Sequence, residues 1–139
     1  MATFNKFNQF VEDLGLGVHN LDTGALKVYL SNAAPSASAD AVKTDLAEIT
    51  NQNGYTAPVD VTGVWSETGG TATLSGTDVV ITATGAVGPF QYVVLYNDTP
   101  TSPADPLIGW WDYGSAITLA NGETFTVDFG ASILTLGQV

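Results

Sequence analysis

An aromatic and acidic cluster is the clearest candidate for chemistry in this sequence. The stretch PLIGWWDYGS at residues 106–115 sets Trp110, Trp111, Asp112 and Tyr113 side by side. Such a cluster could form a platform for a sugar ring, an anchor for another protein, or part of a hydrophobic core. Because side chains alternate faces along a strand, Trp111 and Tyr113 would share one face, and Trp110 and Asp112 the other. The two tryptophans therefore cannot form one flat platform.

The same alternation assigns faces to the residues before the cluster. Leu107 and Gly109 are predicted to share the face of Trp111, whereas Ile108 shares that of Trp110. One indole ring then belongs to the core, and the other lies on the opposite face. That second face is either covered by the protein itself or contacts another chain, and both alternatives stay open at this point. A sugar platform is the third alternative.

Groups for catalysis or metal binding are scarce. The chain has one histidine, His19, and no cysteine or arginine, so nucleophilic catalysis lacks a placed base and zinc lacks ligands. No serine lies in a G-x-S-x-G turn, and no acidic loop has the spacing of a calcium site. A glycosidase needs two carboxylates, and Asp112 with Glu67 or Asp128 is the only arrangement near aromatic rings. We therefore predict a protein that is not an enzyme and that needs no cofactor or metal.

The charge balance argues against two classes of partner. The 139 residues include 14 acidic side chains against three lysines, Lys6, Lys27 and Lys43, which gives a net charge of −11. Proteins that bind nucleic acid neutralise phosphates with lysine and arginine, and an anionic membrane repels an acidic chain. We therefore expect neither nucleic acid nor membrane as a partner. The N-terminus lacks the apolar run of a signal peptide and no stretch is long enough to span a bilayer, so we expect a soluble protein of the cytoplasm or of something assembled there.

The N-terminal segment has the spacing of an amphipathic helix. Residues 4–14, FNKFNQFVEDL, place apolar side chains on one face before Gly15 and Gly17 interrupt the pattern. These side chains are Phe4, Phe7, Phe10, Val11 and Leu14. The predicted helix can pack on its own domain, or residues 1–17 can form an arm that docks on a neighbouring subunit.

Most of the remaining chain has the period of two that is typical of β-strands. Residues 25–31, ALKVYLS, alternate as in a half-buried strand, and a second short helix is predicted over 40–49, with Asp40 as its N-cap. Eight further strands are predicted at 59–66, 70–75, 78–84, 90–97, 107–112, 115–119, 123–129 and 132–137.

Turn residues and burial patterns indicate how these strands assemble. Asn121 and Gly122 lie between two strand patterns, which predicts a tight hairpin. Residues 90–97, FQYVVLYN, are apolar on both faces, as in a strand that is buried on both sides. Many short strands separated by glycines indicate one domain over residues 1–139. We expect a mainly β fold: a single antiparallel β-sandwich, jelly-roll-like, with short helices near the N-terminus. A closed barrel is the alternative.

Three segments carry a resemblance to a known group of proteins. They are MATFNKFNQFVEDLGLGVHNL at the N-terminus, GPFQYVVLYNDT in the centre and PLIGWWDYGSAITLANGETFTVDF near the C-terminus. Together they resemble small proteins that tailed phages encode near their head genes. The resemblance implies a virion structural protein without a catalytic motif, of the head decoration or cement type. It also implies the major capsid protein as partner, the outer surface of the phage head as location, and a homotrimer.

In that setting, the aromatic residues are the predicted interface. Phe4, Phe7 and Phe10 would be apolar anchors that clamp several capsid subunits against the pressure of packed DNA. The further interface candidates are Trp110, Trp111 and Tyr113. The alternative functions are a structural protein of the phage tail, and a carbohydrate-binding module displayed on the virion.

Overall fold

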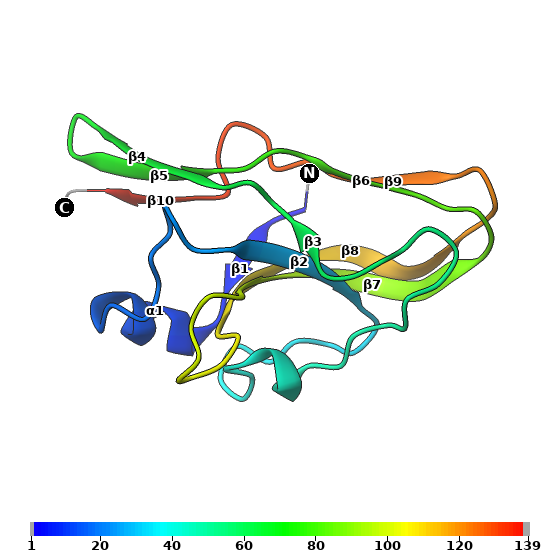
Figure 1. The fold of residues 1–139 in the computed structure, drawn as a ribbon, viewed down its shortest axis with the longest axis horizontal. Coiled ribbons are helices and arrows are strands. Elements are labelled where there is room, and N and C mark those ends of the chain that lie inside the picture. The colour runs from blue at the N-terminus through cyan, green and yellow to red at the C-terminus, as the bar shows by residue number, and fades with distance from the viewer. Residues whose placement is uncertain (1, 138–139) are drawn as a thin grey trace.

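The protein is a mainly β, antiparallel sandwich of two layers (Figure 1). The structure, a computed structural model, describes residues 2–137. One layer is a single five-stranded sheet with the strand order β1-β8-β7-β2-β3. Its strands are β1 (Phe4–Lys6), β8 (Leu107–Leu119), β7 (Val87–Asn97), β2 (Leu26–Ser31) and β3 (Val59–Asp60).

The second layer consists of two smaller sheets that lie end to end above the first (Figure 1). One has the order β10-β5-β4, and the other pairs β6 with β9. The bounds are β4 (Val64–Thr68), β5 (Thr71–Ser75), β6 (Val79–Thr82), β9 (Thr124–Val127) and β10 (Leu134–Gly137). This arrangement confirms the predicted mainly β sandwich.

The main hydrophobic core lies between the two layers. Leu26, Val28 and Leu30 alternate along β2 and all face this interlayer core, as the period of two predicts. The second layer contributes Leu74, Val79, Ile81, Val127 and Phe129.

A second hydrophobic cluster lies on the opposite face of the five-stranded sheet. It contains Phe7, Tyr29, Leu46, Val94, Tyr96 and Leu107. The loops 32–58 and 98–106 cover this face from below in Figure 1. The central strand β7 therefore has apolar side chains buried on both faces, which confirms the prediction made for residues 90–97.

The N-terminal segment differs from the predicted helix over 4–14. Phe4 to Lys6 form strand β1, which pairs with Gly109 to Trp111 of β8, and helix α1 runs only over Asn8–Gly15. The free edge of β8 offers hydrogen-bond partners to the backbone N–H and C=O groups of residues 4–6. This long-range pairing outweighs the helical spacing of the side chains. The three phenylalanines therefore do not line one helix face.

The predicted helix over 40–49 is also wrong. Only a single 3-10 turn forms, at Lys43–Asp45. Asp40 does not cap a helix, because its carboxylate accepts a hydrogen bond from the backbone N–H of Ser36 at 2.7 Å. Asp45 provides the local cap instead, accepting from the N–H groups of Ala41 and Val42. Short polar side chains of this kind compete with helix formation by bonding nearby backbone groups.

The C-terminal half differs in two details of strand assembly. Strand β8 continues through Gly114, where a break was predicted, because this glycine adopts a φ of 101°. Asn121 and Gly122 do form a turn, but it is not a hairpin turn: β8 pairs with β7, whereas β9 pairs with β6 in the other layer. The turn therefore carries the chain from one layer to the other. The predicted strand over 59–66 is likewise divided, into β3 and β4.

Candidate functional site

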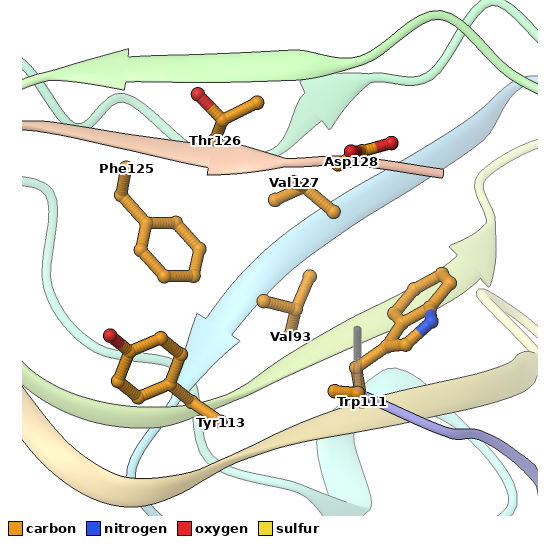
Figure 2. Close-up of a pocket in the computed structure, with 8 residues that line it drawn as sticks. Val93, Trp111, Tyr113, Phe125, Thr126, Val127 and Asp128 are labelled. Carbon is orange, nitrogen blue, oxygen red and sulfur yellow. The ribbon is translucent and has the colours of Figure 1, made fainter. Parts of the chain in front are cut away.

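An open cavity between the two layers is the candidate site (Figure 2). It has a volume of about 310 Å³, at the low end of the range for ligand pockets. The residues that line this aromatic cavity are Ala2, Val93, Trp111, Tyr113, Phe125, Thr126, Val127 and Asp128. Trp111 and Tyr113 come from β8 and Val93 from β7, whereas Phe125 and Val127 reach down from β9 on the opposite side (Figure 2).

A bulge in β8 positions the exposed aromatic ring of the cavity. Phe90 pairs with Ile117 and Tyr92 with Asp112, so the four residues 113–116 of β8 lie opposite the single residue Gln91 of β7. Extra residues of this kind bend a strand and redirect its side chains.

The Asp112 carboxylate closes this bulge. Its Oδ1 atom accepts hydrogen bonds from the Gly114 N–H at 2.7 Å and from Gln91 Nε2 at 2.9 Å. Tyr113 is left with 55% of its surface exposed. Asp112 therefore holds the strand in the shape that presents Tyr113 beside the opening.

Aromatic contacts fix the walls of the cavity. Trp111 is largely buried and packs between the rings of Phe4, at a centroid distance of 4.9 Å, and Phe129, at 5.5 Å. Across the cavity, Phe125 makes edge-to-face contacts with Phe90 at 4.9 Å and with Tyr113 at 5.8 Å. Such pairs hold rings in preferred orientations. Contacts with buried rings thus fix the aromatic walls of the cavity, and Tyr113 is the exposed ring among them.

The two tryptophans lie on opposite faces of β8, as the alternation predicts. Trp110 belongs to the second cluster, where its ring packs against Phe7 at 4.6 Å. The predicted alternation fails further upstream, because Leu95 pairs with Gly109 but Tyr96 pairs with Leu107, which leaves one extra residue in β8. This bulge moves Leu107 to the face of Trp110 and Ile108 to that of Trp111.

The six predicted interface residues therefore divide into separate places. Trp111 and Tyr113 line the aromatic cavity, and Phe4 supports Trp111 from β1. Phe7 is fully buried in the second cluster, and Phe10 is 2% exposed in the interlayer core. The hypothesis that Phe7 and Phe10 anchor a partner is wrong for the folded chain, because both rings pack within their own domain.

The sequence reasoning missed the residues of β9 that complete the site. Phe125 and Val127 face inward from β9, and nothing near them in the sequence indicates a cavity. Asp128 directly follows β9 and lies beside the opening, with its Oδ1 atom accepting from the Gly130 N–H at 2.7 Å. The signal that could have found this wall is the aromatic residue at each end of the period-two run, Phe125 and Phe129.

Among the described residues that line the cavity, Asp128 is the charged one. Lys27 pairs with Asp98 at 2.8 Å, and Lys43 pairs with Glu48. Within residues 2–137, Lys6 is the only lysine without a salt bridge, and no lysine lines the cavity. Neither Asp112 nor Asp128 has an ion-pair partner in the same part of the chain. Any group entering the cavity therefore meets an apolar interior near the unpaired Asp128 carboxylate.

His19 lies elsewhere and is buried. Its ring contacts Phe10 edge-on at 5.1 Å, and Nδ1 lies 3.4 Å from Asn97 Nδ2. Burial lowers the pKa of His19, although the nearby Asp13 carboxylate acts in the opposite direction. Asp13 is also buried, and its Oδ2 atom and His19 Nε2 have no hydrogen-bond partner. This pair lies among core side chains rather than in the cavity.

The described residues contain neither a metal-binding cluster nor a membrane-spanning helix. No group of three or more histidine, aspartate or glutamate side chains in residues 2–137 is arranged to hold a metal ion. The same part of the chain contains no helix that is long and apolar enough to cross a membrane.

No known protein family, curated protein or solved structure matches the chain.

Proposed function

We propose that this chain is a non-enzymatic protein-binding module that acts as a head decoration protein of a tailed phage. The aromatic cavity is the observation that supports a protein-binding role. It places the exposed Tyr113 ring next to an apolar interior whose other walls are fixed by buried residues. Exposed aromatic residues next to a pocket are typical anchors of protein interfaces. The resemblance of three segments to small proteins that tailed phages encode near their head genes supports the assignment to a phage head.

The proposed partner is the major capsid protein, and the proposed location is the outer surface of the phage head. A net charge of −11 suits an exterior position better than contact with packaged DNA. Burial of apolar surface across a joint between capsid subunits contributes roughly 25 cal/mol per Å² before the costs of association are subtracted. Because a head carries many copies, modest affinity per site suffices for stable decoration.

The proposed assembly on the head is a homotrimer. Like charges oppose self-association, so the contact must be apolar and should tighten as salt screens the repulsion. Exposed apolar side chains are available at several places: Val11, Leu16, Val64, Val80 and Leu136. Sedimentation at low and high ionic strength tests this part. A monomer under both conditions, and single copies on the particle, would contradict the trimer.

Imaging of whole virions tests the proposed location. Electron cryomicroscopy of a phage that encodes this chain should place its density on the outside of the head, over joints between capsid subunits. A deletion mutant should lack that density, and its heads should lose DNA at a lower temperature. Density on the tail, with heads unchanged in the deletion mutant, would contradict the proposal and favour the tail alternative.

A further inference from the structure

The aromatic cavity has an interior suited to an apolar side chain. Val93 and Val127 form its floor and roof, and the rings of Trp111, Tyr113 and Phe125 form its sides (Figure 2). Val93 and Val127 are almost fully buried, and Trp111 has 9% of its surface exposed. Filling such a space with a branched or aromatic side chain removes apolar area from water on both partners.

A sugar fits this interior less well. Carbohydrate hydroxyls need hydrogen-bond partners when they leave water, and an unpaired one carries a large desolvation cost. Thr126 points from β9 away from the rings, and the Asp128 carboxylate does not point in among them either (Figure 2). The Trp111 indole N–H and the Tyr113 hydroxyl are then the polar groups of the inner wall. The cavity therefore favours an apolar group over a polyhydroxylated one.

The acidic residues near the cavity favour a positively charged partner segment around the apolar side chain. Asp128 lines the cavity and has no ion-pair partner within residues 2–137. With 14 acidic residues against three lysines, a second copy of this chain would meet like charge here. Charge complementarity favours a basic partner segment.

We infer that the aromatic cavity is a socket for one bulky apolar side chain, such as leucine or phenylalanine, on a basic segment of a partner protein. This inference rests on the proposed function for the class of partner, and it adds the chemistry that the partner must present. The apolar side chain enters beside the Tyr113 ring, and lysine or arginine residues on either side of it face the acidic surface that includes Asp128.

Peptide titration followed by two-dimensional NMR tests the inference. The probe is an acetylated, amidated pentapeptide with a central leucine and two lysines on each side. It should saturate and shift the amide signals of Tyr113, Val127 and their neighbours. The same peptide with central alanine should bind about tenfold or more weakly, because three carbon atoms no longer leave water. A peptide with glutamates in place of the lysines should also bind more weakly, and high salt should remove that difference.

Two variants of the protein localise the binding. Tyr113→Ala removes the exposed wall, and Ala2→Phe fills the mouth of the cavity from the N-terminal segment. Both should weaken binding of the leucine peptide by about tenfold or more, whereas Ala39→Phe, at an exposed position outside the cavity, should not.

Three outcomes would overturn the inference: equal affinity for the leucine and alanine peptides, equal affinity for the basic and acidic peptides at low salt, or shifts at the cavity with maltotriose but not with the leucine peptide. Because the titration uses no capsid, it can fail while heads are still decorated. The peptide can also bind as inferred even if virion imaging places the protein away from the head. A failure of the socket inference is therefore distinguishable from a failure of the proposed function.

Discussion

The rings of Tyr113 and Phe125 meet edge to face across the opening of the aromatic cavity, with centroids 5.8 Å apart. They come from different layers of the sandwich, since Tyr113 belongs to β8 and Phe125 to β9. Phe125 is also held by Phe90, whereas Tyr113 is 55% exposed. One wall is thus fixed by the core and the other is open to solvent, as a binding site for a side chain requires.

Tyr113 should be dispensable for folding. Replacement by alanine removes one aromatic pair and little buried area, so the free energy of unfolding in urea should fall by only about 0.5–1.5 kcal/mol. Phe129→Ala is the matched comparison, because Phe129 is 2% exposed in the interlayer core, and it should cost about 3–5 kcal/mol. Equal losses for the two variants would mean that Tyr113 acts in folding and not as a free contact.

The buried phenylalanines near the N-terminus should act in stability rather than in binding. Phe7→Ala and Phe10→Ala should each lower the free energy of unfolding by about 3–5 kcal/mol, because each leaves a cavity in a packed cluster. Val11→Ala is the control on the same helix, since Val11 is 62% exposed, and it should change stability by less than about 0.5 kcal/mol. If both phenylalanine variants unfold like the control, the N-terminal segment is a detached arm after all.

Gly109 should not tolerate a side chain. A Cβ atom at this position would collide with the Phe4 ring and the Asn5 carbonyl, where β1 pairs with β8. Gly109→Ala should therefore destabilise the protein by about 1–3 kcal/mol by displacing β1. Gly15→Ala is the control, because nothing lies within 4 Å of its added Cβ and alanine favours the helical conformation. A neutral Gly109→Ala variant would mean that β1 is not held against β8 in solution.

The burial of His19 should make stability depend on pH near neutrality. Its pKa in the folded protein lies below the unfolded value of about 6.5. Between the two values the unfolded chain binds a proton that the folded chain does not, so stability falls as the pH is lowered through this window.

Urea titrations at pH 7.0 and 5.5 measure this dependence. The wild-type protein should lose more unfolding free energy between the two pH values than His19→Gln, which has no imidazole to titrate. Asp13 is the charged neighbour that opposes the shift, and it is unchanged in both proteins. Identical losses in the two proteins, or a gain for the wild type at pH 5.5, would show that His19 is not buried in its neutral form.

The comparison of sequence with structure shows which patterns carry information in this chain. Alternation predicted the faces of β2 and the burial of β7 on both sides, because β2 and β7 pair with each other without a shift in register. Alternation failed at Leu107 and Ile108, because a one-residue bulge in β8 exchanges the faces on which these two side chains lie. The residue types around the bulge do not indicate its position.

Local signals were least informative where long-range pairing decides the conformation. The phenylalanine spacing over 4–14 is compatible with a helix, but residues 4–6 lie against an available edge of β8 and become a strand. The Asn121-Gly122 turn was recognised, yet the choice of β6 as the partner of β9 depends on contacts far apart in sequence. For the same reason, Trp111 and Tyr113 could be named from sequence, whereas the opposite wall at Phe125 and Val127 could not.

The most direct measurement is the occupancy of purified, undecorated phage heads by the wild-type protein and by Tyr113→Ala, determined by electron cryomicroscopy at matched concentrations. The heads come from a deletion mutant of a phage that encodes this chain, and Val80→Ala, which alters another exposed apolar residue, is the control. At a concentration that half-saturates the heads with wild-type protein, we predict equal occupancy by the control and an occupancy several-fold lower for Tyr113→Ala. Absence of wild-type protein from the heads, or equal occupancy by wild type and Tyr113→Ala, would contradict decoration through the aromatic cavity.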